Sequence, residues 1–502
     1  MKKIFKVIIF IFIIFLLICT LLYLIFKDNK TNGEYYTSLS QLDNTKLGVT
    51  SNSAFDEIIE DKLPNSTIQY YDNVNDRINA LRTNKISAFI TDEALAKEIV
   101  YKNEDLTYLD EFLTTESFAF AISPKLDELK EEVDNVIIEL RENGTLEYLE
   151  RKWLSEDEEV KELEDIKLSG ENGTIKFGTL ATSAPFAYMK NNEIVGYDID
   201  TMLYICEALG YKLEIVTMDW TGLLTAVSVG KVDMAGCSII VTEERKEKML
   251  FSEPNFTGGV VAVVKQSEYS SGNFIENIKD NFYSTFIEED RYKLFLQGIT
   301  VTLEISISTI VLGTIIGCLF GRARLSKSKI IKNMMKLFIS VIQGLPITLL
   351  LLIMYYIIFQ KIDISPILVS IITFSIYLGV YVAEMIRGSM ESINKNQILA
   401  AKSLGFSKFQ TLRYIIFPQI IISIMPNYKG QIISTVKTTS IVGYISVLDL
   451  TKIGDIVRSR TFDAFFSLIS VAIIYLIFCL VLEKVMNLIE KKVNKKGGRI
   501  TC

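Results

Sequence analysis

The residue types that most often carry out chemistry in proteins are scarce in this sequence. It contains no histidine among its 502 residues, so the commonest general base and metal ligand is missing. The six cysteines are scattered, and only Cys206 and Cys237 lie in the less apolar middle, so their spacing builds neither a disulfide framework nor a zinc site. The phosphate-binding pattern G-x-x-x-x-G-K-S/T is absent. We therefore expect no enzyme and no metal or cofactor site.

Long apolar runs at both ends of the chain indicate a membrane protein. Residues 7–26 carry no charge, follow three lysines and have the length of a membrane-spanning helix. Signal peptides have shorter apolar stretches and small residues before their cleavage site, so residues 1–33 predict an uncleaved N-terminal transmembrane anchor. Cys19 invites a lipid-attachment reading, which the bulky Ile18 before it disfavours.

The second apolar region predicts an all-α polytopic membrane domain at residues 294–490. Apolar stretches near 294–320, 333–359, 365–387, 415–435 and 464–482 indicate about five spans. Basic residues gather at 322–332, 387–413 and 491–499, and such segments stay in the cytoplasm. We expect a multi-pass protein surrounded by cell-membrane lipid, with a cytoplasmic tail at 491–502 and an extracytoplasmic middle. The net charge of −7 includes no basic block suited to nucleic acid.

The middle of the chain predicts a soluble α/β fold in two pieces. Residues 34–155 and 174–268 alternate short β-like runs with amphipathic helical stretches, as in a sheet covered by helices. Between them, residues 156–173 are acidic and then contain glycine, which predicts a solvated linker. A polar linker at 269–293 leads to the membrane domain.

Sequence blocks in both pieces resemble the polar amino-acid solute-binding proteins of ABC importers. Residues 174–268 carry PFAYMKNNEIVGYDID, MDWTGLLTAVSVGKVDMAG and TEERKEKMLFSEP in the order of the first lobe of that family. Residues 34–155 carry LSQLDNTKLGVTSNS, NALRTNKISAFITD, FAFAISPK and ELRENGTLEYLERKWL, which are similar to its second lobe and closing helices. The resemblance implies an α/β two-lobed fold like that of the periplasmic binding proteins.

The two lobes stand in inverted order, which favours a circular permutation with the acidic linker joining the old ends. One crossing near residues 118–123 would then connect the lobes, with lobe two tied to the anchor and lobe one to the first membrane span. The alternative is a pair of decayed remnants of tandem binding domains. A swap of lobes between two chains is left open.

The resemblance implies a cleft that holds an amino acid between the lobes. Arg245 in TEER matches the clamp on the carboxylate, Asp92 at the end of AFITD matches the acid that receives the ammonium, and Trp220 matches the aromatic cover. Taken one at a time, Arg245 is more simply interpreted as a solvated charge, Asp92 as a helix cap and Trp220 as a core aromatic. Their occurrence together at family positions favours a binding site instead. The other expected contacts are small polar residues: Ser238, Thr50, Ser53 and Ser183.

Two departures from the family pattern concern this cleft. Ser183 stands where the family usually has an aromatic, and Ile240 stands where it usually has Ser or Thr. One stacking wall and one hydrogen bond to the carboxylate are thereby removed. They predict a ligand that is less polar than usual or bound more weakly.

Residues 297–490 resemble the permease subunit of the same importers through GITVTLEIS, QGLP, VYVAEMIRG and KTTSIVGYIS. The segment ILAAKSLGFSKFQTLRYIIFP, residues 398–418, looks like the cytoplasmic loop that docks into an ATPase. Ala400, Ala401 and Gly405 keep its helix slim enough for a groove, and Pro418 is expected to stop it before the next span. Leu399 replaces the family's leading glutamate.

The resemblances together predict the binding and permease subunit of an ATP-driven importer for a polar amino acid. Because the chain has no phosphate loop, a separate ABC ATPase is the expected partner, and the permease is expected to form a homodimer. Two alternatives remain. Residues 440–444, SIVGY, faintly resemble a potassium-type filter, so a ligand-gated ion channel is one, and a non-transporting amino-acid receptor is the other.

Overall fold

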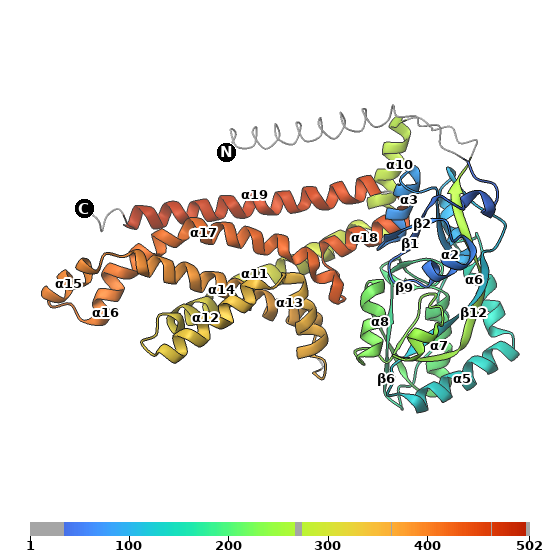
Figure 1. Cartoon of the computed structure of the whole chain (residues 1–502), viewed down its shortest axis with the longest axis horizontal. Helices are drawn as coiled ribbons and strands as arrows, with labels where there is room; N and C mark the ends of the chain where they lie inside the picture. The colour runs from blue at the N-terminus through green and yellow to red at the C-terminus, as the bar shows by residue number, and fades with distance from the viewer. Residues whose placement is uncertain (1–34, 267–273, 363, 463, 498–502) are drawn as a thin grey trace.

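The computed structural model describes residues 35–266, 274–362, 364–462 and 464–497. The anchor expected at 1–33, with Cys19, lies outside the described residues. An α/β domain sits at one end of an elongated bundle of helices, and α15 with α16 forms the opposite end (Figure 1). The chain therefore has a soluble part and a helical part in the predicted order.

One mixed sheet of nine strands runs through the whole α/β domain, in the order β10-β6-β11-β5-β12-β3-β1-β2 with β4 paired to β12. A small second sheet holds three short strands. The strands of the large sheet are β1 (Lys46–Thr50), β2 (Thr67–Tyr71), β3 (Ala88–Asp92), β4 (Leu106–Tyr108), β5 (Thr114–Ile122), β6 (Thr174–Thr179), β10 (Lys212–Thr217), β11 (Met234–Ala235) and β12 (Leu250–Lys265). Those of the small sheet are β7 (Thr182–Ser183), β8 (Ala187–Lys190) and β9 (Glu193–Val195).

Each end of the large sheet forms a lobe of parallel strands and covering helices. Strands β1, β2 and β3 are parallel in lobe two, and β6, β10 and β11 are parallel in lobe one. The helices of lobe two are α2 (Phe55–Lys62), α3 (Val74–Arg82) and α4 (Glu93–Lys102), and those of lobe one are α7 (Tyr197–Leu209), α8 (Trp220–Ser228) and α9 (Glu243–Lys246). All five residues of β3 are buried, since helices or strands cover both of its faces.

Two long strands connect the lobes, which corrects the single crossing expected near residues 118–123. Strand β12 pairs with β5 from Leu250 to Val260 and with β3 and β4 from Val260 to Lys265, so it passes from lobe one into lobe two. The soluble domain consequently begins and ends in lobe two, and lobe one is not the lobe that leads to the membrane. The full length of β12 was not predicted from the sequence because Pro254, Gly258 and Gly259 interrupt its pattern of β-branched residues.

The first half of the soluble region completes the lobe built by the second half. Helices α5 (Asp127–Glu142) and α6 (Thr145–Trp153) pack against lobe one. Trp153 is fully buried, donates from Nε1 to Asp200 Oδ2 at 2.8 Å and meets the ring of Tyr188 edge-on at 6.1 Å. One sheet and one core therefore unite the two halves, which argues against two separate remnant domains.

The helical domain holds three helices long and apolar enough to cross a membrane within the described residues, or up to four if a bent pair counts as one span. The three are residues 288–324, 366–392 and 466–494, and the bent pair is α12 with α13, which turn by 107° around Leu345 and Pro346. The fourth expected span corresponds to a helix, α17. Its apolar sequence is interrupted by Pro426, Lys429 and Lys437. The count of about five spans stays a prediction.

The helices of this domain follow one another as α10 (Phe274–Phe286), η2 (Glu288–Asp290), α11 (Tyr292–Arg324), α12 (Lys329–Gly344), α13 (Ile347–Ile353), η3 (Met354–Ile358), α14 (Pro366–Ser392), α15 (Lys395–Ser403), α16 (Lys408–Gln410), η4 (Thr411–Ile416), α17 (Phe417–Thr438), η5 (Thr439–Ile445), α18 (Leu450–Thr461) and α19 (Ala464–Gly497). Helices α11 and α14 approach closely at Gly317, where an added Cβ would lie 2.5 Å from Val382. Small residues at such contacts let membrane helices pack backbone to backbone.

We predict that Trp153→Phe destabilises the soluble domain by about 1–3 kcal/mol, because the buried Asp200 carboxylate loses a hydrogen-bond donor while the packing stays similar. Thermal unfolding of the purified full chain measures the loss. Tyr148→Phe is the matched control, since its hydroxyl bonds Glu164 at an exposed position. An unchanged unfolding temperature for Trp153→Phe would contradict the packing of α6 on lobe one.

Candidate functional site

A cavity of about 760 Å³ lies between the two lobes and reaches the helical domain. Its walls come from the carboxyl ends of β1, β2 and β3, from the loops after β6, β10 and β11, and from α13, η3, η5 and α18. Parallel strands place the side chains that follow them at one sheet edge, which is where α/β folds bind small molecules. The cavity is thus the natural candidate for a solute site.

Lobe two contributes a carboxylate to this cavity. Asp92 ends β3, caps α4 by accepting a bond from the Leu95 amide at 2.8 Å, and is 4% exposed. Burial raises the pKa of Asp92 to about 6, against the opposing effects of that bond and of the nearby Arg77 charge. A carboxylate held at this depth is costly without a cationic partner, so it can accept an ammonium group.

Lobe one contributes a guanidinium. Thr242 caps α9 by accepting from the Arg245 amide, which sets this arginine at the start of a short helix. Arg245 donates from Nη1 to the Ile240 carbonyl at 2.7 Å and from Nη2 to the Asn52 carbonyl at 2.8 Å, and its guanidinium carbon lies 5.8 Å from the centre of the Trp220 ring. Because Asn52 belongs to lobe two, Arg245 ties the lobes directly together.

The structure brings all seven residues predicted for ligand binding to this one cavity; their role in binding stays a prediction. Ser238 has a left-handed backbone, with φ of 51°, and its hydroxyl is buried without a partner in the described part of the chain. Such strain in a non-glycine residue is typical of functional sites. The seven lining residues are Asp92, Arg245, Trp220, Ser238, Thr50, Ser53 and Ser183.

Sequence reasoning missed two lining residues on α3, Asn75 and Arg77, which are 2% and 3% exposed. On an amphipathic helix, asparagine and arginine are normally expected to face solvent. The available signal was Asn73, whose side chain caps α3 immediately after β2 and so places the first turn of that helix at the sheet edge.

Helix α18 contacts both lobes beside the cavity. Lys452 forms an ion pair with Asp219 of lobe one, and Arg458 pairs with Asp76 of lobe two at 3.1 Å. Phe462, just after α18, is 6% exposed within an apolar cluster of lobe two. Ala181 and Met189 of lobe one pack with residues of α11 and α18 in another cluster. One helix therefore holds both lobes of the soluble domain against the helical domain.

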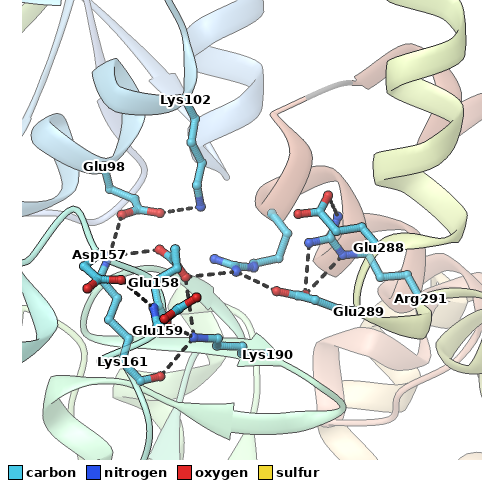
Figure 2. A network of polar contacts seen from close by, with 11 residues as sticks. Glu98, Lys102, Asp157, Glu158, Glu159, Lys161, Lys190, Glu288, Glu289 and Arg291 are labelled. Atoms are coloured by element: carbon cyan, nitrogen blue, oxygen red, sulfur yellow. Dashed lines mark hydrogen bonds and ion pairs between the residues drawn. The ribbon is translucent and has the colours of Figure 1, made fainter.

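Lys161 of the acidic linker forms part of this junction, whereas the rest of the segment is exposed or half-buried, in keeping with a solvated connection. Lys161 is 3% exposed and pairs with Glu98 at 3.4 Å and Glu158 at 3.0 Å. Figure 2 shows Lys161 and Glu158 lying among Glu98 and Lys102 of lobe two, Lys190 of lobe one and the segment around Glu289. Arg460 of α18 reaches Glu158 at 3.8 Å and Glu289 at 3.0 Å. Lys161 is buried where opposite charges from the linker, lobe two and α18 compensate one another.

The predicted ATPase-docking residues lie at the far end from the α/β domain (Figure 1). Ala400 and Ala401 belong to α15, where Ala401 is 1% exposed and so packs inward, and Gly405 follows with φ of 82°. Leu404 and Phe409 expose 76% and 74% of their apolar side chains at this tip. The structure places these residues together; whether an ATPase binds them stays a prediction.

Pro418 does not stop a helix, contrary to expectation. It lies in the first turn of α17, directly after the π-helical η4. Because α17 continues directly from η4 with helical backbone at Ile416, the wider π-helical turn accommodates the proline inside a continuous helix. Gly405, with its left-handed backbone, is what ends α15.

Comparison with known proteins finds relatives for both parts of the chain. Residues 175–440 match the bacterial extracellular solute-binding proteins, family 3. The probable amino-acid ABC transporter permease protein YckA of Bacillus subtilis is 33% identical over 211 residues, which cover 42% of this chain and 93% of that protein. The glutamine transport system permease protein GlnP of Escherichia coli K12 is 33% identical over 204 residues, covering 40% and 93%.

One solved structure similar to this chain is described as the crystal structure of an amino acid ABC transporter with histidines. It is 29% identical, with a TM-score of 0.39, over 44% of this chain and 100% of that one.

We predict that Asp76→Asn together with Asp219→Asn loosens the contact between α18 and the lobes. Hydrogen exchange of the α18 amides should accelerate only a few-fold in each single variant, because both carboxylates are partly solvated, and by about tenfold in the double variant. Mass spectrometry of the detergent-solubilised chain measures the exchange. Asp61→Asn, which pairs only with its neighbour Lys62 at an exposed site, is the control. Equal exchange in the double variant and the wild type would contradict this docking.

Proposed function

Because this chain belongs to the bacterial extracellular solute-binding proteins of family 3 and to the amino-acid ABC transporter permeases, we propose that it imports a polar amino acid or a similar small zwitterion. The cleft binds the solute outside the cell membrane, the helical domain conducts it through the surrounding lipid, and a separate ABC ATPase drives the cycle. Two such permeases form a homodimer, with the binding domains outside and the α15–α16 tip and C-terminus in the cytoplasm.

The observation that carries this proposal is a single cavity with opposite charges on opposite lobes and a helical domain as its third wall. A zwitterion leaves no charge uncompensated when its ammonium faces Asp92 and its carboxylate faces Arg245. The guanidinium offers a planar fork to the carboxylate, and Trp220 lies beside it. A solute released from this cleft is already next to the membrane helices.

Closure of the lobes is proposed to follow from the same charges. In the structure, Arg245 uses two backbone carbonyls as acceptors, one from each lobe. A ligand carboxylate is the stronger acceptor because it is charged, and Asp92 adds a contact from lobe two. Binding then favours the closed state by the difference in affinity between the closed and open states.

The inverted lobe order is proposed to be a circular permutation. The linker at 156–173 joins α6 to β6 within lobe one, as expected of a segment that closes two former ends. Both chain ends of the soluble domain lie in lobe two. Tethering through these ends keeps the binding domain at a high local concentration over its own permease.

No observation favours the ion-channel alternative. A potassium-type filter needs extended backbone with aligned carbonyl groups, whereas residues 440–444 lie within the 3₁₀-helix η5.

Uptake by proteoliposomes containing the chain and its ATPase tests the proposal. We expect ATP-dependent accumulation of a labelled amino acid, lowered at least about tenfold by Arg245→Ala, because the carboxylate loses its charged partner. Lys246→Ala, on the adjacent exposed position, should transport normally. An amino-acid-dependent current without ATP, or binding without uptake, would overturn the importer.

Amino-acid binding is predicted to weaken in acid with an inflection near pH 6. Since burial raises the pKa of Asp92 to about 6, its carboxylate is ionised above that pH and loses its charge as the pH falls through it. Affinity should be level above about pH 7 and fall roughly tenfold per pH unit below 6. Calorimetric titrations from pH 4.5 to 8 measure this profile.

Asp92→Asn is the control for that profile, since it should bind weakly at every pH and show no inflection. Asp198, another buried carboxyl whose pKa is raised to about 7, bonds to Asn255 instead and is unchanged in this variant. An inflection that persisted in Asp92→Asn would assign the pH dependence to another group.

A further inference from the structure

The two lobes rest on a surface of the helical domain that lies beside the cavity. We call this surface the seat; it is formed by Tyr356 of η3, by Gln360 shortly after it, and by Lys452 and Arg458 of α18. Three of these residues, Tyr356, Lys452 and Arg458, also line the cavity. The seat therefore supports the binding domain and forms part of the third wall of the candidate solute site.

Lobe one lies on the η3 part of the seat through α8. The Tyr356 hydroxyl donates to the Gly222 carbonyl at 3.4 Å, in the first turn of that helix. Gln360 Nε2 donates to the Val229 carbonyl at 2.9 Å, where the helix ends. Both ends of α8 are thus fixed to one short stretch of the helical domain.

The contact at Gly222 is particularly close. A Cβ atom on this glycine would lie 3.0 Å from the Tyr356 hydroxyl oxygen and 3.4 Å from the Tyr444 carbonyl oxygen. Both distances are shorter than the about 3.5–4.0 Å of an ordinary van der Waals contact. Trp220, which lies beside Arg245 in the cleft, stands two residues earlier on the same helix. The first turn of α8 therefore joins the solute site directly to the seat.

Lobe two lies on the α18 part of the seat. Arg458 pairs with Asp76 of α3 at 3.1 Å, and Phe462, just after α18, is 6% exposed within the apolar cluster of that lobe. Lys102 of α4 places its Nζ 5.9 Å from the centre of the Phe462 ring. Aromatic side chains buried in this way anchor specific interfaces. Lobe two and α18 are therefore complementary in shape and in charge.

The connection between the binding domain and the helical domain is short. Residues 266–273 join β12 to α10, and eight residues extend over at most roughly 30 Å. Glu289, which follows α10, pairs with Arg460 of α18 at 3.0 Å, so the far end of this connection is held to the helix that carries the seat. A short tether gives the binding domain a higher effective concentration at the seat of its own chain than at any other seat.

Resting on the proposed importer function, we infer that each binding domain docks on the seat of its own chain and delivers its solute there, so that each protomer of the dimer is a complete delivery unit. Lobe one contacts η3 and lobe two contacts α18, and both elements belong to the same permease half. A binding domain that straddled two permeases would lose one of these two sets of contacts.

Uptake by dimers that contain two different chains tests this inference. The cleft defect is Arg245→Ala, and the seat defect is Lys452→Met with Arg458→Met, which removes both ion pairs from the side of the helical domain. Two chains with different affinity tags are produced together, purified through both tags and reconstituted with the ATPase. The homodimer with the seat defect should take up amino acid about tenfold more slowly than the wild type.

Two arrangements of the same defects separate docking within a chain from docking between chains. A dimer of one wild-type chain and one chain with both defects should keep about half of the wild-type uptake, because one delivery unit is intact. A dimer with the cleft defect in one chain and the seat defect in the other should fall about tenfold, because neither chain then has a working cleft above a working seat. The control is Lys293→Met, which removes an exposed pair with Asp290 outside the cavity and should leave uptake unchanged.

Half of the wild-type uptake in the dimer that divides the defects would overturn the inference, because the cleft of one chain would then serve the seat of the other. Loss of uptake in the dimer with one intact chain would also overturn it, since the binding domain would need both permeases. If the seat variant fails to fold by thermal unfolding, Tyr356→Phe with Gln360→Ala carries the test. Absence of uptake by the wild-type dimer would overturn the proposed function and this inference with it.

Discussion

The pairing of β5 with β12 is the constraint on which the binding site depends. These two antiparallel strands belong to both lobes, and no other described strand does so. Irregular register around Pro254 bends β12 where it passes between the lobes, as bulges commonly do. Asp92, at the end of β3, and Arg245, shortly before β12, face one cavity because β12 is hydrogen-bonded to β3 on one side and to β5 on the other.

The sequence predicted the site residues that belong to recognisable local motifs. It did not predict the charged residues that become buried through contacts with distant parts of the chain. Arg245, Asp92 and Trp220 could be placed because each follows a recognisable strand or motif. Arg77 could not, because an arginine on an amphipathic helix is normally solvated, and only its bond to the Ile90 carbonyl shows it turned inward. Lys161 was missed for the same reason. An acidic linker is expected to be solvated, but here Lys161 pairs with Glu98 of lobe two, and Glu158 of the linker is reached by Arg460 of α18.

The junction between the lobes and α18 has consequences for the order of events in transport. A separate binding protein must find its permease by diffusion, but here docking contacts are made by residues of the same chain. Phe462 lies within the apolar cluster of lobe two, and the charges labelled in Figure 2 come from each lobe, the linker and the segment around Glu289. Arg460 of α18 pairs with Glu158 and Glu289 of that network. Removing one member leaves others buried and unpaired, so these charges hold the lobes, the linker and α18 together.

The contacts of Arg245 also bear on the affinity of the proposed site. Arg245 already has acceptors in Ile240 and Asn52, so a ligand gains only the difference between a charged carboxylate and two neutral carbonyls. Asp92 accepts from the Leu95 amide, which competes with a ligand ammonium for the carboxylate. Lys452 of α18 pairs with Asp219 of lobe one and Arg458 pairs with Asp76 of lobe two, so both walls of the cavity are held to the helical domain by the same helix.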